Sequence, residues 1–231
     1  GTLALVYDPI KEKHYWQDIP FQDTSFNQTQ DIIRLKIDTE GKMSGSLLMK
    51  SRGRIAQIIR KQARNPESFK QVMQYRVNQL FAGAQLLDHK AVQVNDLYNP
   101  AQASMTFKHD SWVKREGKYF RIPAVIDWTP KQLFQLKERR YPLILGPNKE
   151  WSWQTEIELP QHLEVSHMPN DEVIASDCLS LSRTSEWIAN QNKIKMTWTY
   201  RSTCERLNPT DYLKHRDLSR QMISSLNQEI V

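Results

Sequence analysis

Cysteine is scarce in this chain of 231 residues, which contains only Cys178 and Cys204. Two cysteines cannot build a framework of several disulfides or a zinc site with four thiolates. No apolar run reaches the roughly 18 residues that a transmembrane helix needs, so we expect no membrane span. A glycine-rich phosphate-binding loop is also missing, with 7 glycines in the whole chain. We therefore exclude disulfide scaffolds, four-cysteine zinc modules and P-loop proteins, and we expect no cofactor.

Positive charge is in mild excess. The formal net charge is +6, from 32 lysines and arginines against 26 acidic residues. Such a surface favours anionic partners such as nucleic acid, acidic glycans or lipid headgroups, and the plainer interpretation is a solvated surface. The first residues, GTLALVYDPIKEKHYW, lack the basic leader and cleavage site of a signal peptide. They begin in the middle of a pattern, as in a segment of a longer protein.

The first half of the chain has the pattern of a sheet interrupted by helices. In 31–49, Ile33, Leu35 and Ile37 alternate with neighbours of the opposite face, and Asp38-Thr39-Glu40-Gly41 has the composition of a hairpin turn. The apolar spacing becomes helical over 54–82. Asn65-Pro66 is typical of a new helix start, so we predict two consecutive helices, or one helix broken there.

The second half predicts more strands and a final helix. Residues 151–159 alternate, 162–169 form a short strand, 179–200 form a hairpin with its turn at 190–193, and a helix begins after Asn208. We predict an α+β fold that is mainly antiparallel β. It consists of two β-sandwich-like modules, 1–145 with the helical pair and 146–231 with the C-terminal helix.

Catalytic groups of the papain type are not recognisable. That chemistry needs a thiolate, a histidine base and an orienting carboxylate, and the cysteine usually begins a helix whose dipole lowers its pKa. Cys178 and Cys204 both lie in strand patterns, and the six histidines are scattered. We expect this chain not to be an enzyme and to have no catalytic residue. A Cys–His pair formed only in three dimensions is the alternative.

The two cysteines have two interpretations. A hairpin turn centred on Gln191 places Cys178 opposite Cys204, which favours a disulfide. The apolar phase of the two strands puts the two side chains on opposite faces unless a β-bulge intervenes, which favours two buried thiols.

Metal ligands are poorly spaced. His162 and His167 could converge with Asp171, but exposed loop histidines are the commoner arrangement, so we expect no metal site.

A basic run and the tryptophans are the candidates for binding. The run has no acid within it and consists of Lys50, Arg52, Arg54, Arg60, Lys61 and Arg64. We assign Arg52, Arg54, Lys61 and Arg64 as an anion-binding group, with a solvated helix face as the alternative. The run lacks interleaved aromatics, so we expect no nucleic-acid partner. Trp151 and Trp153 share one strand face, which fits either a sugar-binding platform or a core.

Four motifs occur in an order that resembles one family. They are GTLALVYD, IDTEGKMSGSLLMKSRGRIAQIIRK, ELPQHLEV and LNPTDYLKHRDL. Together they resemble the β-rich region that follows the catalytic core of bacterial transglutaminase-like proteins. The resemblance implies an exported or periplasmic setting and a non-catalytic accessory role. The partner would be the upstream core of the same protein, with an envelope protein or polysaccharide as a further partner. The alternative function is an independent carbohydrate- or anionic-polymer-binding module.

Overall fold

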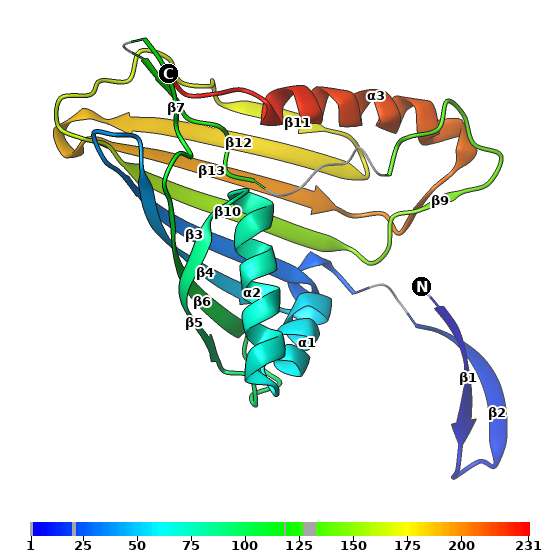
Figure 1. Cartoon of the computed structure of the whole chain (residues 1–231). Helices are drawn as coiled ribbons and strands as arrows, with labels where there is room; N and C mark the ends of the chain where they lie inside the picture. The colour runs from blue at the N-terminus through cyan, green and yellow to red at the C-terminus, as the bar shows by residue number, and fades with distance from the viewer. Residues whose placement is uncertain (1, 20–21, 118, 127–132) are drawn as a thin grey trace.

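A computed structural model describes residues 2–19, 22–117, 119–126 and 133–231 of the chain (Figure 1). Its main element is a mixed sheet of eight strands in the order β11-β12-β13-β10-β3-β4-β6-β5. Three α-helices accompany it, the last near the C-terminus. The predicted class, α+β and mainly antiparallel β, is confirmed.

The strands of this sheet come from almost the whole chain. They are β3 (Gln28–Ile37), β4 (Met43–Ser51), β5 (Gln85–Val92), β6 (Ala101–His109), β10 (Lys149–Glu158), β11 (Glu172–Ala175), β12 (Leu179–Ile188) and β13 (Lys193–Ser202). All neighbours are antiparallel except β3 and β10, which run parallel with Asp31 beside Trp153. This parallel pair joins strands from the two predicted modules into one sheet. The division at residue 145 stays a prediction.

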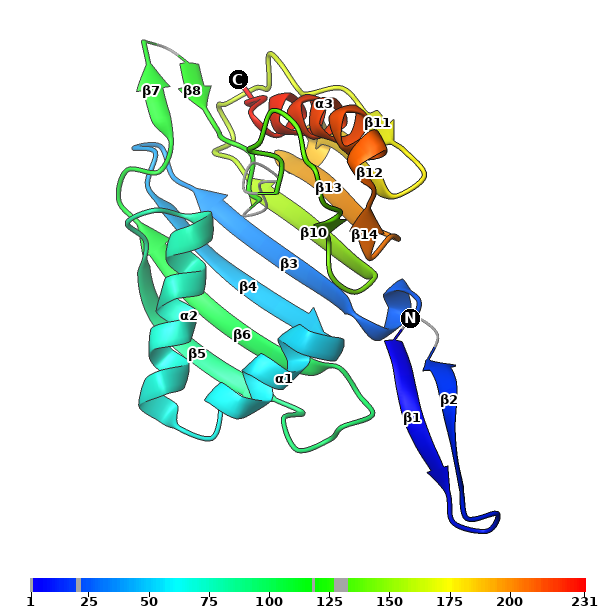
Figure 2. The same ribbon diagram turned by 90° about the vertical axis from the view of Figure 1, so that its right-hand side faces the viewer.

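Three short pairs lie outside the main sheet. They are β1 (Thr2–Asp8) with β2 (Lys13–Ile19), β7 (Lys114–Glu116) with β8 (Tyr119–Arg121), and β9 (Leu143–Ile144) with β14 (Arg206–Leu207). The described residues also form the 3-10 turns η1 (Thr24–Phe26) and η3 (Ala189–Gln191). Figures 1 and 2 show the β1–β2 hairpin projecting away from the rest of the molecule.

The predicted helical pair is confirmed as α1 (Gly53–Gln62) and α2 (Pro66–Leu80). The first helix ends at Gln62, with Ala63 as its C-cap. Asn65 caps the start of the second, since its side chain accepts a hydrogen bond from the backbone N–H of Ser68 at 3.1 Å and proline occupies the first position of α2. The final helix is α3 (Pro209–Leu226). No described helix is long and apolar enough to cross a membrane.

All three helices cover the same face of the sheet (Figure 2). The inward residues are buried along every central strand, among them Ile33, Leu35, Trp153, Ile157, Leu181, Trp198 and Tyr200. The opposite face is polar and carries ion pairs between neighbouring strands, such as Lys36 with Glu158 at 2.9 Å. The alternation that predicted the strands therefore separates a buried face from a solvated one.

Two expectations differ from the structure. The described residues form one large sheet covered by helices, where we expected sandwich-like packing, because the amphipathic helices bury the apolar face that a second sheet would otherwise cover. The short strand predicted over 162–169 was wrong. That segment instead uses backbone N–H groups of Ser166 and His167 to bind the carbonyl of Val231, at 2.8 and 2.9 Å.

Candidate functional site

The basic run divides into two groups with different surroundings. Arg52 and Arg60 bind backbone carbonyls of the loop before β6: Arg52 Nη1 donates to the Tyr98 carbonyl at 3.1 Å, and Arg60 Nη2 donates to those of Asp96 and Asn99 at 2.7 and 2.8 Å. These hydrogen bonds hold the loop against the start of α1. The predicted residue Arg52 therefore has a structural contact as well as an exposed side chain.

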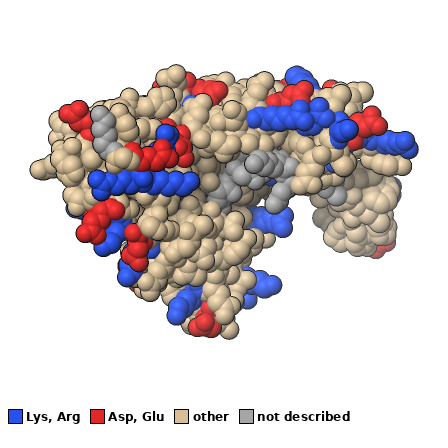
Figure 3. Space-filling model, turned by 45° about the horizontal axis from the view of Figure 1, so that its top comes forward, with Lys and Arg blue, Asp and Glu red and all other residues tan. Residues whose placement is uncertain are grey.

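Arg54, Lys61 and Arg64 form the second group and are exposed. Arg54 also lies near Lys149 of β10, whose pKa is lowered by burial and by the positive charge of Arg54. On the face seen in Figure 3, acidic and basic side chains are interspersed. Anion binding by the predicted residues stays a prediction.

Cys178 and Cys204 are joined by a disulfide, with their Cα atoms 5.0 Å apart. The hairpin register pairs Leu179 with Ser202, so both cysteines lie just beyond the ladder. Within an unbroken ladder, strand phase would place the two side chains on opposite faces. Beyond the ladder this alternation no longer determines which way the side chains point. No β-bulge is needed, because the chain leaves the sheet after Ser202.

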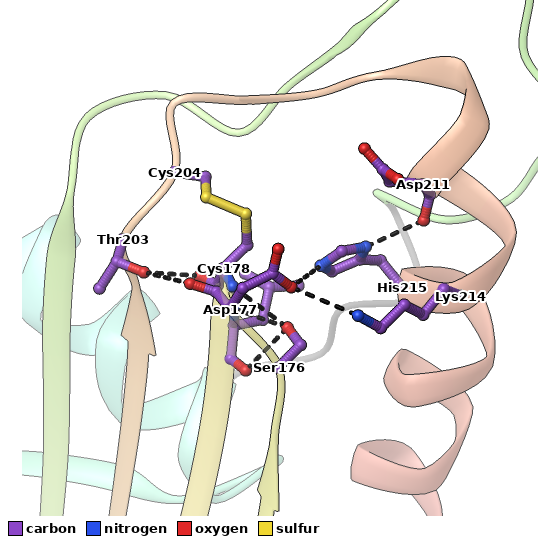
Figure 4. Close-up of a disulfide and its surroundings, with 9 residues drawn as sticks. Ser176, Asp177, Cys178, Thr203, Cys204, Asp211, Lys214 and His215 are labelled. Carbon is purple, nitrogen blue, oxygen red and sulfur yellow. Dashed lines mark hydrogen bonds and ion pairs between the residues drawn. A yellow bond between two sulfur atoms is a disulfide. The ribbon is translucent and has the colours of Figure 1, made fainter.

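A histidine and a carboxylate lie beside this disulfide (Figure 4). His215 of α3 is buried, and its Nδ1 lies 2.9 Å from the carbonyl oxygen of Asp211. A carbonyl only accepts, so Nδ1 carries the hydrogen. The other ring nitrogen, Nε2, lies 3.6 Å from the carboxylate of Asp177. The pKa of Asp177 is lowered by a backbone hydrogen bond and by the charges of Lys214 and His215.

These residues bring a cysteine, a histidine and an aspartate together. The sequence allowed a Cys–His pair in three dimensions as an alternative but did not indicate which residues would form it. Ligand atoms of Asp177, Cys178 and His215 lie within 4.8 Å of one another. The Cys178 sulfur is bonded to Cys204 and has no thiolate to offer as a nucleophile or metal ligand in this form. The trio His162, His167 and Asp171 does not form such a group among the described residues.

A cavity of about 180 Å³ lies between α1, α2 and the sheet. Its walls are mostly apolar, from Met49, Ile55, Ile58, Ile59, Val72, Met73, Tyr75, Trp151 and Trp153. Ile58 and Tyr75 are exposed, so they lie where the cavity opens to solvent. Trp153 is fully buried and Trp151 is half-buried, and their rings meet edge to face with centroids 5.9 Å apart. The tryptophans of β10 thus serve both the core and the cavity wall.

The cavity also has polar groups. Asp31 of β3 is 1% exposed and is paired with Arg76 of α2. Burial raises the pKa of Asp31 above its ordinary value, although the Arg76 charge acts in the opposite direction. Arg76 donates to Oδ2 of this carboxylate, while Oδ1 is buried and has no hydrogen-bond partner within the described ranges. The indole Nε1 of Trp153 is likewise buried, and no described residue accepts a hydrogen bond from it.

The sequence did contain a signal for this site. Asp31 falls on the same strand phase as Ile33, Leu35 and Ile37, which are all apolar. Arg76 lies one turn after Val72 and Met73 on the apolar side of α2. A charge of each sign on facing apolar surfaces is typical of a buried ion pair.

Comparison with known proteins gives limited matches. A solved structure described as "crystal structure of a putative protease from Parabacteroides distasonis" is similar over 41% of this chain and 18% of its own length, with 15% identity and a TM-score of 0.36. This chain therefore spans less than a fifth of that protein. No curated protein matches. Residues 118–231 match the family model described as "Domain of Unknown Function with solved-structure structure (DUF3858)".

Proposed function

We propose that this chain is a non-catalytic accessory region of a larger, exported, transglutaminase-like protein, and that it docks onto another part of that protein through the β1–β2 hairpin. The observation that carries the proposal is the exposed apolar surface of this hairpin. Leu3, Leu5, Tyr7 and Trp16 are 57%, 56%, 53% and 64% exposed.

Both faces of the hairpin carry apolar side chains that another protein surface could bury. Leu5 pairs with Trp16 on one face, and Val6 pairs with Tyr15 on the other. A two-stranded hairpin is at best marginally stable alone in water. Large exposed apolar patches rich in tryptophan and tyrosine are typical of interaction surfaces. A second protein surface against one or both faces would supply the missing burial.

Two further features support an exported protein and a transglutaminase-like core as the docking partner. The Cys178–Cys204 disulfide favours an oxidising compartment, as expected for an exported protein. The order of sequence motifs that resembles the region after a transglutaminase-like core points to that core as the docking partner. The match of residues 118–231 to a family without an assigned function leaves that role open.

The test combines the coding sequence with association. We expect the segment encoded immediately before residue 1 to contain a Cys…His…Asp core and to co-purify with this chain when the two are co-expressed. The double variant Leu5→Lys/Trp16→Lys should abolish co-purification. The matched control is Tyr98→Lys, which changes a 90%-exposed aromatic of the loop before β6. The proposal fails if no such core precedes the chain, or if the hairpin variant associates as well as the control.

A second candidate function is an independent module for an anionic polymer. The exposure of Arg54, Lys61 and Arg64 on and after α1 favours it. Binding would then depend on these three charges and fall with salt, since exposed charges are screened. It would not depend on the hairpin, so the same hairpin variant separates the two functions.

A further inference from the structure

The structure assigns the cavity between α1, α2 and the sheet as a binding site. We propose that it takes an uncharged amphiphile, an apolar body about the size of one aromatic ring that carries a carboxamide or hydroxyl group. This site is independent of the docking hairpin, which lies outside the main sheet.

Size and wall chemistry define the apolar part of the ligand. The cavity volume of about 180 Å³ is close to that of engineered apolar cavities of about 150 Å³ that bind benzene. Its aliphatic and aromatic walls come from β4, β10 and both helices. Binding sites for small molecules are typically apolar, with a few polar groups that fix the orientation of the ligand.

The polar part follows from two unpaired atoms on neighbouring strands. Asp31 and Trp153 lie side by side in the β3–β10 ladder, and both line the cavity. Both side chains are 1% exposed. Asp31 Oδ1 accepts hydrogen bonds, Trp153 Nε1 donates them, and neither has a partner among the described residues. A ligand group that both donates and accepts, such as a carboxamide or hydroxyl, would satisfy the two atoms together.

Charge selects a neutral ligand. The Asp31 carboxylate is already paired with the Arg76 guanidinium, so the polar end of the cavity has no net charge to compensate. An ammonium group would meet Arg76, and a carboxylate would meet Asp31. Either ion would be buried without a counter-ion, which is far more costly than burying a hydrogen-bonded neutral group.

The test uses four probes that share one ring: benzamide, toluene, benzoate and benzylamine. We expect saturable binding of benzamide with a Kd of about 1 mM or tighter, measured by calorimetry and by ligand-observed NMR. Toluene, benzoate and benzylamine should each bind more weakly. The proposal is overturned if benzamide does not bind, if toluene binds equally well, or if either charged probe binds more tightly.

Two variants locate the binding. Trp153→Phe keeps a ring and removes the N–H, so the ratio of benzamide to toluene affinity should fall about fivefold. Phenylalanine is smaller than tryptophan and enlarges the cavity for both probes alike, so the ratio of their affinities removes this effect. Ile58→Trp changes a 41%-exposed residue at the opening and should abolish binding of benzamide, whereas Gln71→Trp on the exposed side of α2 should leave it unchanged. Retained binding in Ile58→Trp would place benzamide elsewhere and overturn the assignment, even if Trp153→Phe fails to fold.

Discussion

Each half of the sheet has an arginine at the contact with its helical cover. Arg183 is buried and Arg76 is partly buried, and the two differ in how their surroundings are satisfied. Under α3, Arg183 donates to the carbonyls of Asn170 and Ser225 at 2.8 and 3.0 Å, lies 3.3 Å from Glu172 and stacks over Trp198 at 5.0 Å. Its pKa is lowered by burial, although Glu172 opposes that change.

Between α2 and the sheet, Arg76 of α2 pairs with Asp31, but the second oxygen of that carboxylate has no hydrogen-bond partner in the part of the chain that the structure describes. An apolar cavity adjoins this pair, while the α3 side carries a disulfide at the end of its hairpin. An arginine at the contact between a helix and the sheet can therefore serve two purposes. Arg183 is surrounded by acceptors and holds structural elements together. Arg76 pairs with a carboxylate whose second oxygen can still accept hydrogen bonds beside the cavity, so this pair suits the binding site proposed above.

The largest effect should come from removing Arg183. We expect Arg183→Met to lower the free energy of unfolding by about 4 kcal/mol, because the carbonyl of buried Ser225 and that of Asn170 lose their donor and the contact with Trp198 is lost. Urea unfolding measures it. The control is Arg201→Met, an exposed partner of Glu150, which should cost less than about 1 kcal/mol. Equal losses in the two variants would contradict a stabilising role specific to Arg183.

Loss of the disulfide should be the next largest effect. Its cysteines are 26 residues apart, and a loop of this length contributes about 3.5 kcal/mol through the entropy of the unfolded chain. Cys178→Ser/Cys204→Ser should therefore unfold at lower urea concentration than the oxidised protein. A reducing agent should destabilise the wild type and leave the double variant unchanged. Insensitivity of the wild type to reduction would show that the bridge contributes little.

Asp31 should give a smaller effect with a distinctive pH dependence. Burial raises its folded-state pKa above the ordinary value of 3.8, so between 3.8 and the raised pKa the folded state binds more protons than the unfolded state. The stability of the wild type should fall through this window as pH rises. Asp31→Asn cannot ionise there, so its stability should improve relative to the wild type over the same window.

Urea unfolding at a series of pH values measures this difference. Asp88→Asn, which removes an exposed carboxylate of β5, is the control. If Asp31→Asn instead loses stability relative to the wild type as pH rises, the charge of Arg76 outweighs burial in setting the pKa of Asp31.

The smallest effect on stability should come from the exposed charges of α1. Lys61→Glu and Arg64→Glu should each change the free energy of unfolding by less than about 0.5 kcal/mol. Retention on an anionic polymer column at low salt should nevertheless fall if the second candidate function holds. Unchanged retention in the combined Arg54→Glu/Lys61→Glu/Arg64→Glu variant would remove that function from consideration.

Local features of the fold were predictable because they depend on patterns among residues close together in the sequence. Alternation around Ile33 and Trp153 and the Asn65-Pro66 helix start gave β3, β10 and the helical pair. The partner of β3 was not predictable. Its parallel contact with β10 joins residues 122 positions apart, as in the hydrogen bond between Gln28 and Glu150, and no local pattern records such a pairing.

The disulfide, the Cys178–His215 contact and the cavity could not be predicted from the sequence for related reasons. The disulfide depends on where the chain leaves the hairpin after Ser202, which strand phase does not determine. The meeting of Cys178 with His215 depends on how α3 packs beside the hairpin. The cavity depends on α1 and α2 crossing the sheet at one place, and only the charges of Asp31 and Arg76 marked that place in the sequence.

The parallel contact of β3 with β10 also has a consequence for biosynthesis. Strands β3 to β6 leave the ribosome well before β10 does, and the order of the sheet makes β3 an open edge until β10 arrives. An unpaired edge is a template for pairing with other chains, and pairings between distant segments form slowly. The nascent protein thus passes through a period in which β3 is an unpaired edge open to aggregation, and pairing with residues 149–158 ends that period.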